Sequence, residues 1–188
     1  MNVLLNKFPQ KIKIANEIYD INSDFRNCLK IIMAYEDDEL TINEKHYIML
    51  KRLYGTIPKN IEEATEKGIL FLDCGKKEEN NPLEEAKRVY SFSKDSEYIY
   101  SAINQTHNVD LERARYLHWW KFVFFFMDVN KDCTLSCFIS LRDKKNKKKL
   151  NKEERAFWIN MRNLLDLDYT PEPTDDESDF MKLWNNGN

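Results

Sequence analysis

The sequence feature that most constrains the fold is an aromatic run between Leu117 and Met127. It contains two tryptophans and four phenylalanines, and its only formal charge is on Lys121. A helix that is apolar on nearly every side belongs in the interior of a protein. The run is well short of the roughly 20 residues that a membrane-spanning helix needs. We therefore expect a central helix that is buried all round, and no membrane segment.

Composition narrows the classes of fold and function further. Of the 188 residues, 42% are hydrophobic, which is enough for a sizeable core without disulfides or structural metals. Four glycines and five prolines are few, which argues against Gly-rich phosphate-binding loops and against an all-β fold with frequent turns. The four cysteines form no Cys-x-x-Cys pair, and no signal peptide opens the chain, so we expect a cytoplasmic protein.

Apolar residues recur at helical spacing in several segments that begin at capping signals. The spacing of a capping box, in which two backbone amides at a helix start are satisfied, occurs in three pairs: Thr41 with Glu44, Asn60 with Glu63 and Asn151 with Glu154. The predicted N-caps are Ser23, Thr41, Asn60, Ser93, Asp110 and Asn151. The helices that they begin are predicted to end near Glu36, Gly55, Gly75, His107, Met127 and Leu165. A further short helix is expected over residues 135–141.

The N-terminal region has a different periodicity. Residues 11–21 alternate polar and apolar on either side of Ala15 and Asn16, where Asn tolerates the positive φ of a tight turn. This pattern predicts a short β-hairpin. The expected fold class is therefore mainly α, a helical bundle-like single domain over residues 1–165 with an N-terminal hairpin.

Charge is unevenly distributed although the net charge is only −3. Residues 142–152 hold seven Lys or Arg and one acid, and residues 166–179 hold seven acids and no Lys or Arg. We expect a basic loop at 142–152, an acidic C-terminal tail at 166–188 and an exposed linker near 76–82. A solvated loop is favoured over phosphate binding, because no aromatic residues interleave with the lysines. The two blocks can also attract each other within a Debye length of roughly 8 Å.

The tail ends in an apolar cluster, Phe180, Met181, Leu183 and Trp184. Such a cluster after an acidic tether can dock in a groove on this or another protein. The alternative is loose packing against the body of the chain, and the sequence does not choose between the two.

No pattern in the sequence points to catalysis, a metal or a cofactor. Residues 128–135 resemble the start of an EF-hand loop, but Cys133 stands where the turn glycine should be and Ile139 where the bidentate Glu should be. Cys133 and Cys137 form only one loose pair, so buried thiols are favoured over zinc. His118, beside two tryptophans, is expected to hydrogen-bond in the core rather than to titrate in a site. We expect a protein that is not an enzyme.

Several short motifs in a fixed order resemble one known family. They are Ile21 to Arg26, Phe92 to Asp95 followed by Tyr98 to Tyr100, Val109 to Leu111, and above all His118 to Phe122, with Arg142 and the helix of Glu154 after them. In this order, from about Lys11 to Arg162, the chain resembles the bacteriophage gene-product-fifteen family of siphophages and prophages. The family-motif residues, expected to be structural, are Asp24, Phe25, Arg26, Asp95, Asp110, His118, Trp119, Trp120, Phe122 and Arg142.

The resemblance implies a predominantly helical tail assembly chaperone that acts with the tape measure protein and other tail proteins in the cytoplasm of the bacterial host. It brings no catalytic, metal or cofactor positions, and it implies neither a nucleic acid nor a membrane as partner. The alternatives are a minor structural protein retained in the tail and, with less support, a calcium-binding protein built on Asp128 to Asp132. No pattern identifies the partner-binding surface.

Overall fold

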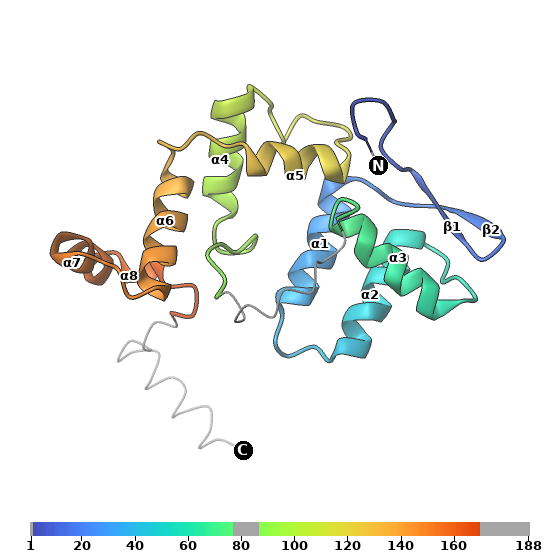
Figure 1. Ribbon diagram of the computed structural model, residues 1–188, viewed down its shortest axis with the longest axis horizontal. Helices are drawn as coiled ribbons and strands as arrows, with labels where there is room; N and C mark the ends of the chain where they lie inside the picture. The colour runs from blue at the N-terminus through green and yellow to red at the C-terminus, as the bar shows by residue number, and fades with distance from the viewer. Residues whose placement is uncertain (1, 77–86, 170–188) are drawn as a thin grey trace, which may run out of the picture. The chain divides into compact units, whose positions relative to one another are not determined.

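Helices dominate the computed structural model, which describes residues 2–76 and 87–169 (Figure 1). The elements in chain order are β1 (Lys11–Ile14), β2 (Glu17–Asp20), α1 (Phe25–Glu36), α2 (Ile42–Tyr54), α3 (Ile61–Leu72), α4 (Ser96–His107), α5 (Trp119–Met127), α6 (Thr134–Asn146), α7 (Lys152–Asn160) and α8 (Arg162–Leu165). The two strands form an antiparallel pair. The mainly α fold class with an N-terminal hairpin is confirmed.

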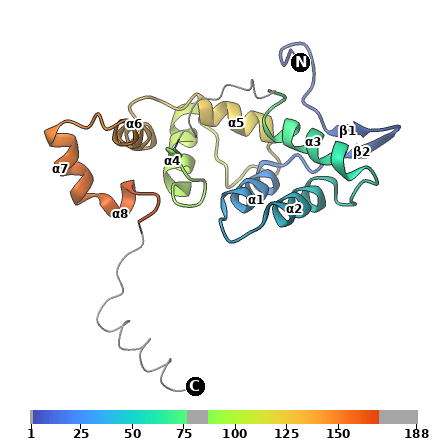
Figure 2. The same ribbon diagram turned by 60° about the horizontal axis from the view of Figure 1, so that its bottom comes forward.

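The described residues group into two compact units. The first comprises residues 2–76 and 91–136, and the second comprises residues 87–90 and 137–169. Within the first unit, α1 packs on α2, α2 on α3, and both α1 and α4 on α5, while α3 also contacts β1. Figures 1 and 2 both show α1, α2 and α3 side by side, with the hairpin next to α3.

The hairpin forms where the alternation predicted it, but its turn uses a different residue. Ile14 pairs with Glu17, so Ala15 and Asn16 form a two-residue turn. Ala15, and not Asn16, adopts the positive φ, at 49°. The backbone N–H of Ala15 donates to the Glu63 carboxylate, 2.9 Å away, and this bond from α3 holds the turn in place.

Two of the predicted capping devices are confirmed in full. Thr41 and Glu44 make the reciprocal box at the start of α2, and Asn151 and Glu154 make it at the start of α7. Helix α2 closes at Gly55, whose φ of 68° suits a residue without a Cβ. At α3 only half of the box forms: Asn60 accepts from the Glu63 amide, and the Glu63 carboxylate bonds the hairpin turn and Lys67.

Other predicted helix ends are wrong by a few residues. Asp24, and not Ser23, caps α1, because the Asp24 carboxylate accepts the Arg26 backbone N–H. Helix α3 ends at Leu72 rather than at Gly75. Helix α4 begins at Ser96 rather than after Ser93, because residues 92–95 form turns ahead of the helix. Its C-terminal end at His107, with left-handed Asn108 as cap, is as predicted.

The largest correction concerns residues 110–118. The sequence predicted a helix that starts at Asp110, but α5 starts only at Trp119. Asp110 caps a single turn, in which its carboxylate accepts from the amides of Glu112 and Arg113. The chain then runs as an irregular segment to His118.

Helix α5 is buried on one face rather than all round. Trp119, Trp120, Phe122 and Phe126 are buried, and Phe122 is only 1% exposed. Phe124 and Phe125 are partly exposed, and Met127 is 69% exposed. The neighbouring helices therefore cover only part of the apolar surface of α5.

In the second unit the first residues of the basic block lie in a helix and not in a loop. Helix α6 continues to Asn146, so Arg142, Lys144 and Lys145 are helical, and the predicted boundary of a loop at 142 is wrong. The last predicted helix is divided into α7 and α8 at Met161. Leu165 is fully buried and Trp158 nearly so, whereas Phe157 and Ile159 are exposed.

Three predictions lie wholly or mainly outside the described residues. Of the linker near 76–82, only Lys76 is described; of the acidic tail 166–188, only residues 166–169 are. The apolar cluster from Phe180 to Trp184 is outside as well. Among the helices of the described residues, none is long and apolar enough to cross a membrane.

We expect Trp120→Ala to lower the free energy of unfolding by about 3–5 kcal/mol, because it opens a cavity where a nearly buried indole packs. Lys121→Ala, on the exposed side of the same helix, should change it by less than about 1 kcal/mol. Urea denaturation followed by circular dichroism measures both. Equal, small effects would show that α5 is not the centre of the core.

Candidate functional site

Six of the family-motif residues, Asp24 to Arg26 and His118 to Trp120, lie where two helix starts meet. Asp24 and His118 form an isolated antiparallel bridge, and each caps the helix that follows it. The Phe25 amide donates to the Leu117 carbonyl at 2.9 Å, and the Trp119 amide donates to the Ser23 carbonyl at 2.8 Å. We call this arrangement the cap junction. It fixes the N-terminus of α1 against the N-terminus of α5.

The Asp24 carboxylate serves both sides of the cap junction. One oxygen accepts from the Arg26 amide at 3.0 Å, and the other accepts from the Leu117 amide at 3.3 Å. Helix N-termini carry partial positive charge, so a carboxylate between two of them is electrostatically favourable. An Asp is thus suited to this position both as acceptor and as anion.

Arg26 explains why residues 111–117 are not helical. Its guanidinium donates to the carbonyls of Leu111, at 2.6 Å, and Ala114, at 2.9 Å. In a helix those carbonyls would accept from backbone amides four residues later. The guanidinium also lies 4.5 Å from the centre of the Phe25 ring. Both bonds come from one terminal nitrogen, Nη2, while the planar guanidinium lies over an aromatic face, and Arg provides this combination whereas Lys does not.

His118 is buried in the cap junction as a neutral ring with one defined tautomer. Its Nδ1 accepts from the Trp120 amide at 3.1 Å, so the proton is on Nε2, which donates to the Pro9 carbonyl at 3.0 Å. Burial among aromatic rings lowers the pKa of His118. The ring is therefore a structural cap held by its uncharged form.

Trp119 and Trp120 fasten α5 to the end of α3. Their indole N–H groups donate to the carbonyls of Leu72 and Phe71, each at 2.8 Å. The Trp120 ring also closes over Gly75, whose φ is 75° and where an added Cβ would lie 3.3 Å from the indole. The indoles thus add partners for two C-terminal carbonyls of α3, of which the Phe71 carbonyl also accepts from the Cys74 amide.

Beside the cap junction lies an apolar groove of about 350 Å³. It is formed by α1, α4, α5 and the irregular segment at Leu111 and Glu112. Its apolar lining consists of Phe25, Leu29, Phe92, Ile99, Leu111 and Phe122, with Arg26, Ser96, Tyr100 and Glu112 as the polar members. The Phe25 and Phe122 rings stack at 5.0 Å between centroids, which forms a rigid wall. A volume of this size accommodates large apolar side chains.

Asp95 supports the groove from within. It is 1% exposed, and its carboxylate accepts from the Ser91 amide at 2.9 Å, which closes the turns before α4. Phe92, inside those turns, reaches α5 and lies 5.3 Å from Phe126 between ring centroids. The buried carboxylate thus positions an aromatic side chain that lines the groove.

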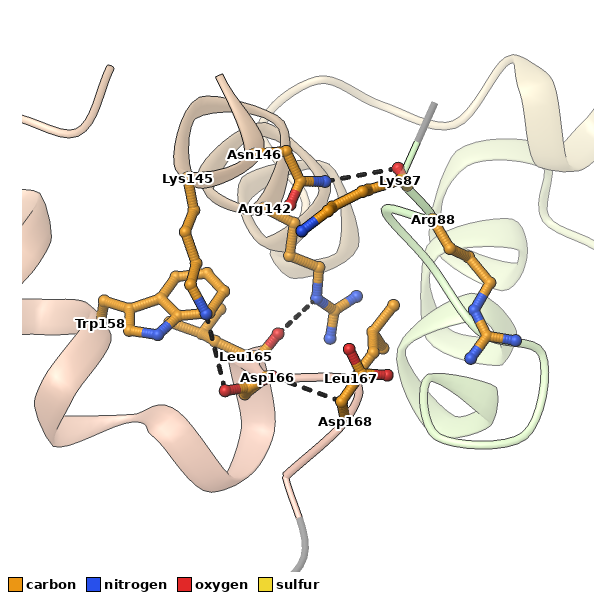
Figure 3. A pocket seen from close by; sticks show the side chains of 10 residues that line it. All are labelled: Lys87, Arg88, Arg142, Lys145, Asn146, Trp158, Leu165, Asp166, Leu167 and Asp168. Carbon is orange, nitrogen blue, oxygen red and sulfur yellow. Dashed lines mark hydrogen bonds and ion pairs between the residues drawn. The ribbon is translucent and has the colours of Figure 1, made fainter. Parts of the chain in front are cut away.

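Arg142 belongs to the second unit. It is 2% exposed, and its guanidinium donates to the Leu165 carbonyl at 2.7 Å (Figure 3). It also donates to the carbonyls of Leu164 and Val89, at 2.9 and 3.2 Å. These bonds join α6, the end of α8 and residues 87–90. The charge pattern predicted this arginine at the edge of a solvated loop, whereas the family resemblance predicted a structural role, and the structure places it in the interior of its unit.

The calcium-like segment has the geometry of an ordinary interhelical turn. The Asn130 side chain accepts from the Asp132 amide, and its backbone bonds Thr106 and Ser136. Within residues 2–76 and 87–169, no group of three or more His, Cys, Asp or Glu is arranged to hold a metal ion. All four cysteines are free thiols.

Comparison with known families decides the relationship of this chain. The family model described as bacteriophage Gp15 protein matches residues 4–167. The chain belongs to the bacteriophage Gp15 protein family. No curated protein and no solved structure matches it.

Membership of the Gp15 family identifies the chain as a phage protein of the structural or morphogenesis class. Nine of the ten family-motif residues lie in the first unit, at or near the cap junction and the groove, and Arg142 lies in the second. Sequence reasoning missed the groove itself. Leu29, Phe92, Ile99 and Leu111 come from separate segments, and a predicted helix over 111–117 hid the loop that brings Leu111 into place.

Stability should fall as the pH drops below the ordinary histidine pKa of about 6.5, because the fold lowers the pKa of His118 and the unfolded chain then binds the extra proton. The loss should continue until the pH falls below the lowered pKa of the folded state. His118→Asn keeps a side-chain acceptor at the cap and removes the titration. Urea titrations between pH 5 and 8 should show a weaker pH dependence in this variant; an unchanged dependence would contradict the assignment.

Arg26→Lys should destabilise the first unit by about 1–2 kcal/mol, because the ammonium group of the shorter lysine does not keep both the bonds of Nη2 to the two carbonyls and the contact of a planar guanidinium with the Phe25 ring. Hydrogen exchange of the amides in residues 111–117 should accelerate as well. Arg52→Lys, at an exposed position of α2, is the matched control and should be near neutral. If exchange in 111–117 is unaltered by Arg26→Lys, the guanidinium does not hold this segment.

Proposed function

We propose that this protein is a tail assembly chaperone that binds the tape measure protein during tail morphogenesis, in the cytoplasm of the bacterial host. Family membership supports a role in phage morphogenesis. The single structural observation that carries the finer proposal is the apolar groove of about 350 Å³ beside the cap junction.

The groove suits a helical ligand with an apolar stripe. Tape measure proteins are long helices of this kind, and an uncovered stripe drives aggregation. A helix in such a groove inserts side chains spaced i, i+3 or i+4, and i+7. The wall of the groove is rigid, because Phe25 and Phe122 are stacked and the neighbouring backbone is fixed by Arg26 and Asp95. A preformed groove reduces the entropy lost on binding.

The proposed role is binding rather than catalysis. In the described residues the groove is lined mainly by apolar side chains, with Arg26 and Glu112 as its charged members. The Arg26 guanidinium is engaged with backbone carbonyls. Other tail proteins are further proposed partners, since a chaperone must hand over its client during assembly.

Co-expression with the tape measure protein encoded in the same phage genome tests the proposal. The wild-type chain should keep that protein in the soluble fraction. Leu29→Glu, which places a carboxylate in the groove, should weaken binding by at least about tenfold. Ile69→Glu, on an exposed position of α3 outside the groove, is the matched control and should bind like the wild type.

Each outcome has a defined meaning. If the tape measure protein is insoluble with the wild-type chain, the chaperone proposal is wrong. If it is soluble with Leu29→Glu as well, the groove is not the binding site. Stoichiometric amounts of the chain in purified virions would favour the alternative, a minor structural protein retained in the tail. Tight calcium binding in a calorimetric titration would favour the calcium-binding alternative.

A further inference from the structure

The second unit contains a pocket of about 300 Å³ that the proposed function does not use (Figure 3). We call it the basic cup. Four cationic side chains line it, Lys87, Arg88, Arg142 and Lys145, against the two carboxylates of Asp166 and Asp168. The lining therefore has a surplus of two positive charges, which favours an anionic ligand.

The side chain of Lys145 is held at the wall of the basic cup by Trp158 and Asp166. Its ammonium group lies 4.0 Å from the centre of the Trp158 ring and 3.6 Å from the Asp166 carboxylate. Figure 3 shows the amine above the indole, with the Asp166 side chain just beyond it. A lysine fixed in this way loses less side-chain entropy when it binds a carboxylate than one in solvent.

The chain leaves the described part of the structure directly at this pocket. Asp168 lines the basic cup, and the described residues end at Tyr169. The sequence then continues with Glu172, Asp175, Asp176, Glu177 and Asp179, and contains no Lys or Arg until Lys182. An extended residue spans at most about 3.6 Å, so Glu172 is within about 11 Å of Tyr169 along the chain.

We propose that the acidic segment Glu172–Asp179 is the ligand of the basic cup. Three observations carry the assignment: the positive surplus of the cup, the fixed position of Lys145, and the short tether from Tyr169. Lys145 already bonds Asp166, a member of the same acidic block. The segment adds further carboxylates to this pairing of the basic and acidic blocks, beside Lys87 in the same lining.

Because the acidic segment is tethered to the basic cup, even a weak contact is sufficient to occupy it. A short linker gives a bound segment an effective concentration in the millimolar range, so an affinity of that order half-occupies the cup. Exposed ion pairs contribute little individually and are screened by salt. Occupancy should therefore be high at low ionic strength and fall steeply as salt is added, and an acidic partner segment could displace the tail.

Zero-length crosslinking of the full chain with a carbodiimide tests the contact. Amide links should form between acids of residues 172–179 and Lys87 or Lys145, and 0.5 M NaCl should suppress them several-fold. Lys148 and Lys152, nearby in the sequence but not part of the cup, serve as internal controls and should give several-fold fewer links. Similar yields at all these lysines would overturn the proposal.

A mixture of ¹⁴N- and ¹⁵N-labelled chains shows whether the links form within one chain. Links confined to peptides of a single label support the proposal. Links that join the two labels in equal proportion would overturn it, because the segment would then bind a second copy.

The Trp158 indole N–H resonance of the full chain gives an independent readout. Asp175→Asn, Asp176→Asn and Glu177→Gln together should shift this resonance at low salt toward its high-salt position. Asp37→Asn, Asp38→Asn and Glu39→Gln, in an equally acidic exposed loop of the first unit, should leave it in place. A resonance that is the same in the tail variant and the wild type would contradict the proposal.

Discussion

The first unit depends on one short contact, the two-residue bridge between Asp24 and His118. Each partner caps the helix that follows it, and the bridge joins the backbone just before α1 to the backbone just before α5. Helix starts have unsatisfied amides and partial positive charge, so they rarely pack together without a partner for both. Here a carboxylate and a neutral imidazole provide those partners. The position of α5, the groove, and the bonds from Trp119 and Trp120 to the end of α3 follow from this arrangement.

The sequence predicted what depends on neighbouring residues. The capping boxes at Thr41 and Asn151, the cap at Gly55 and the hairpin alternation are local patterns, and the structure contains all of them. Predictions failed where distant residues compete for the same backbone groups. Arg26 takes carbonyls that a helix from Asp110 would need, and the hairpin turn takes the Glu63 carboxylate that a full box at Asn60 would need.

The candidate site shows the same limit. The family resemblance gave most residues of the cap junction, although the capping signals pointed to Ser23 instead of Asp24 and the predicted helix from Asp110 included His118. The groove beside the cap junction could not be predicted, since its lining comes from four segments and the one that holds Leu111 was expected to be helical. Arg142 illustrates a further difficulty: within a block of lysines, no local pattern distinguishes the one buried cation from its solvated neighbours.

The paired indoles of Trp119 and Trp120 have a consequence for changes in the length of this chain. They anchor the carbonyls of Phe71 and Leu72, and Trp120 closes over Gly75, so the chain is fixed in position up to the point just before Lys76. Changes in the length of the chain after Lys76 should therefore not alter how α3 packs on its neighbours. Insertions or deletions at that point are therefore expected to leave the groove in place, whereas replacing an indole removes the bond that holds its own carbonyl.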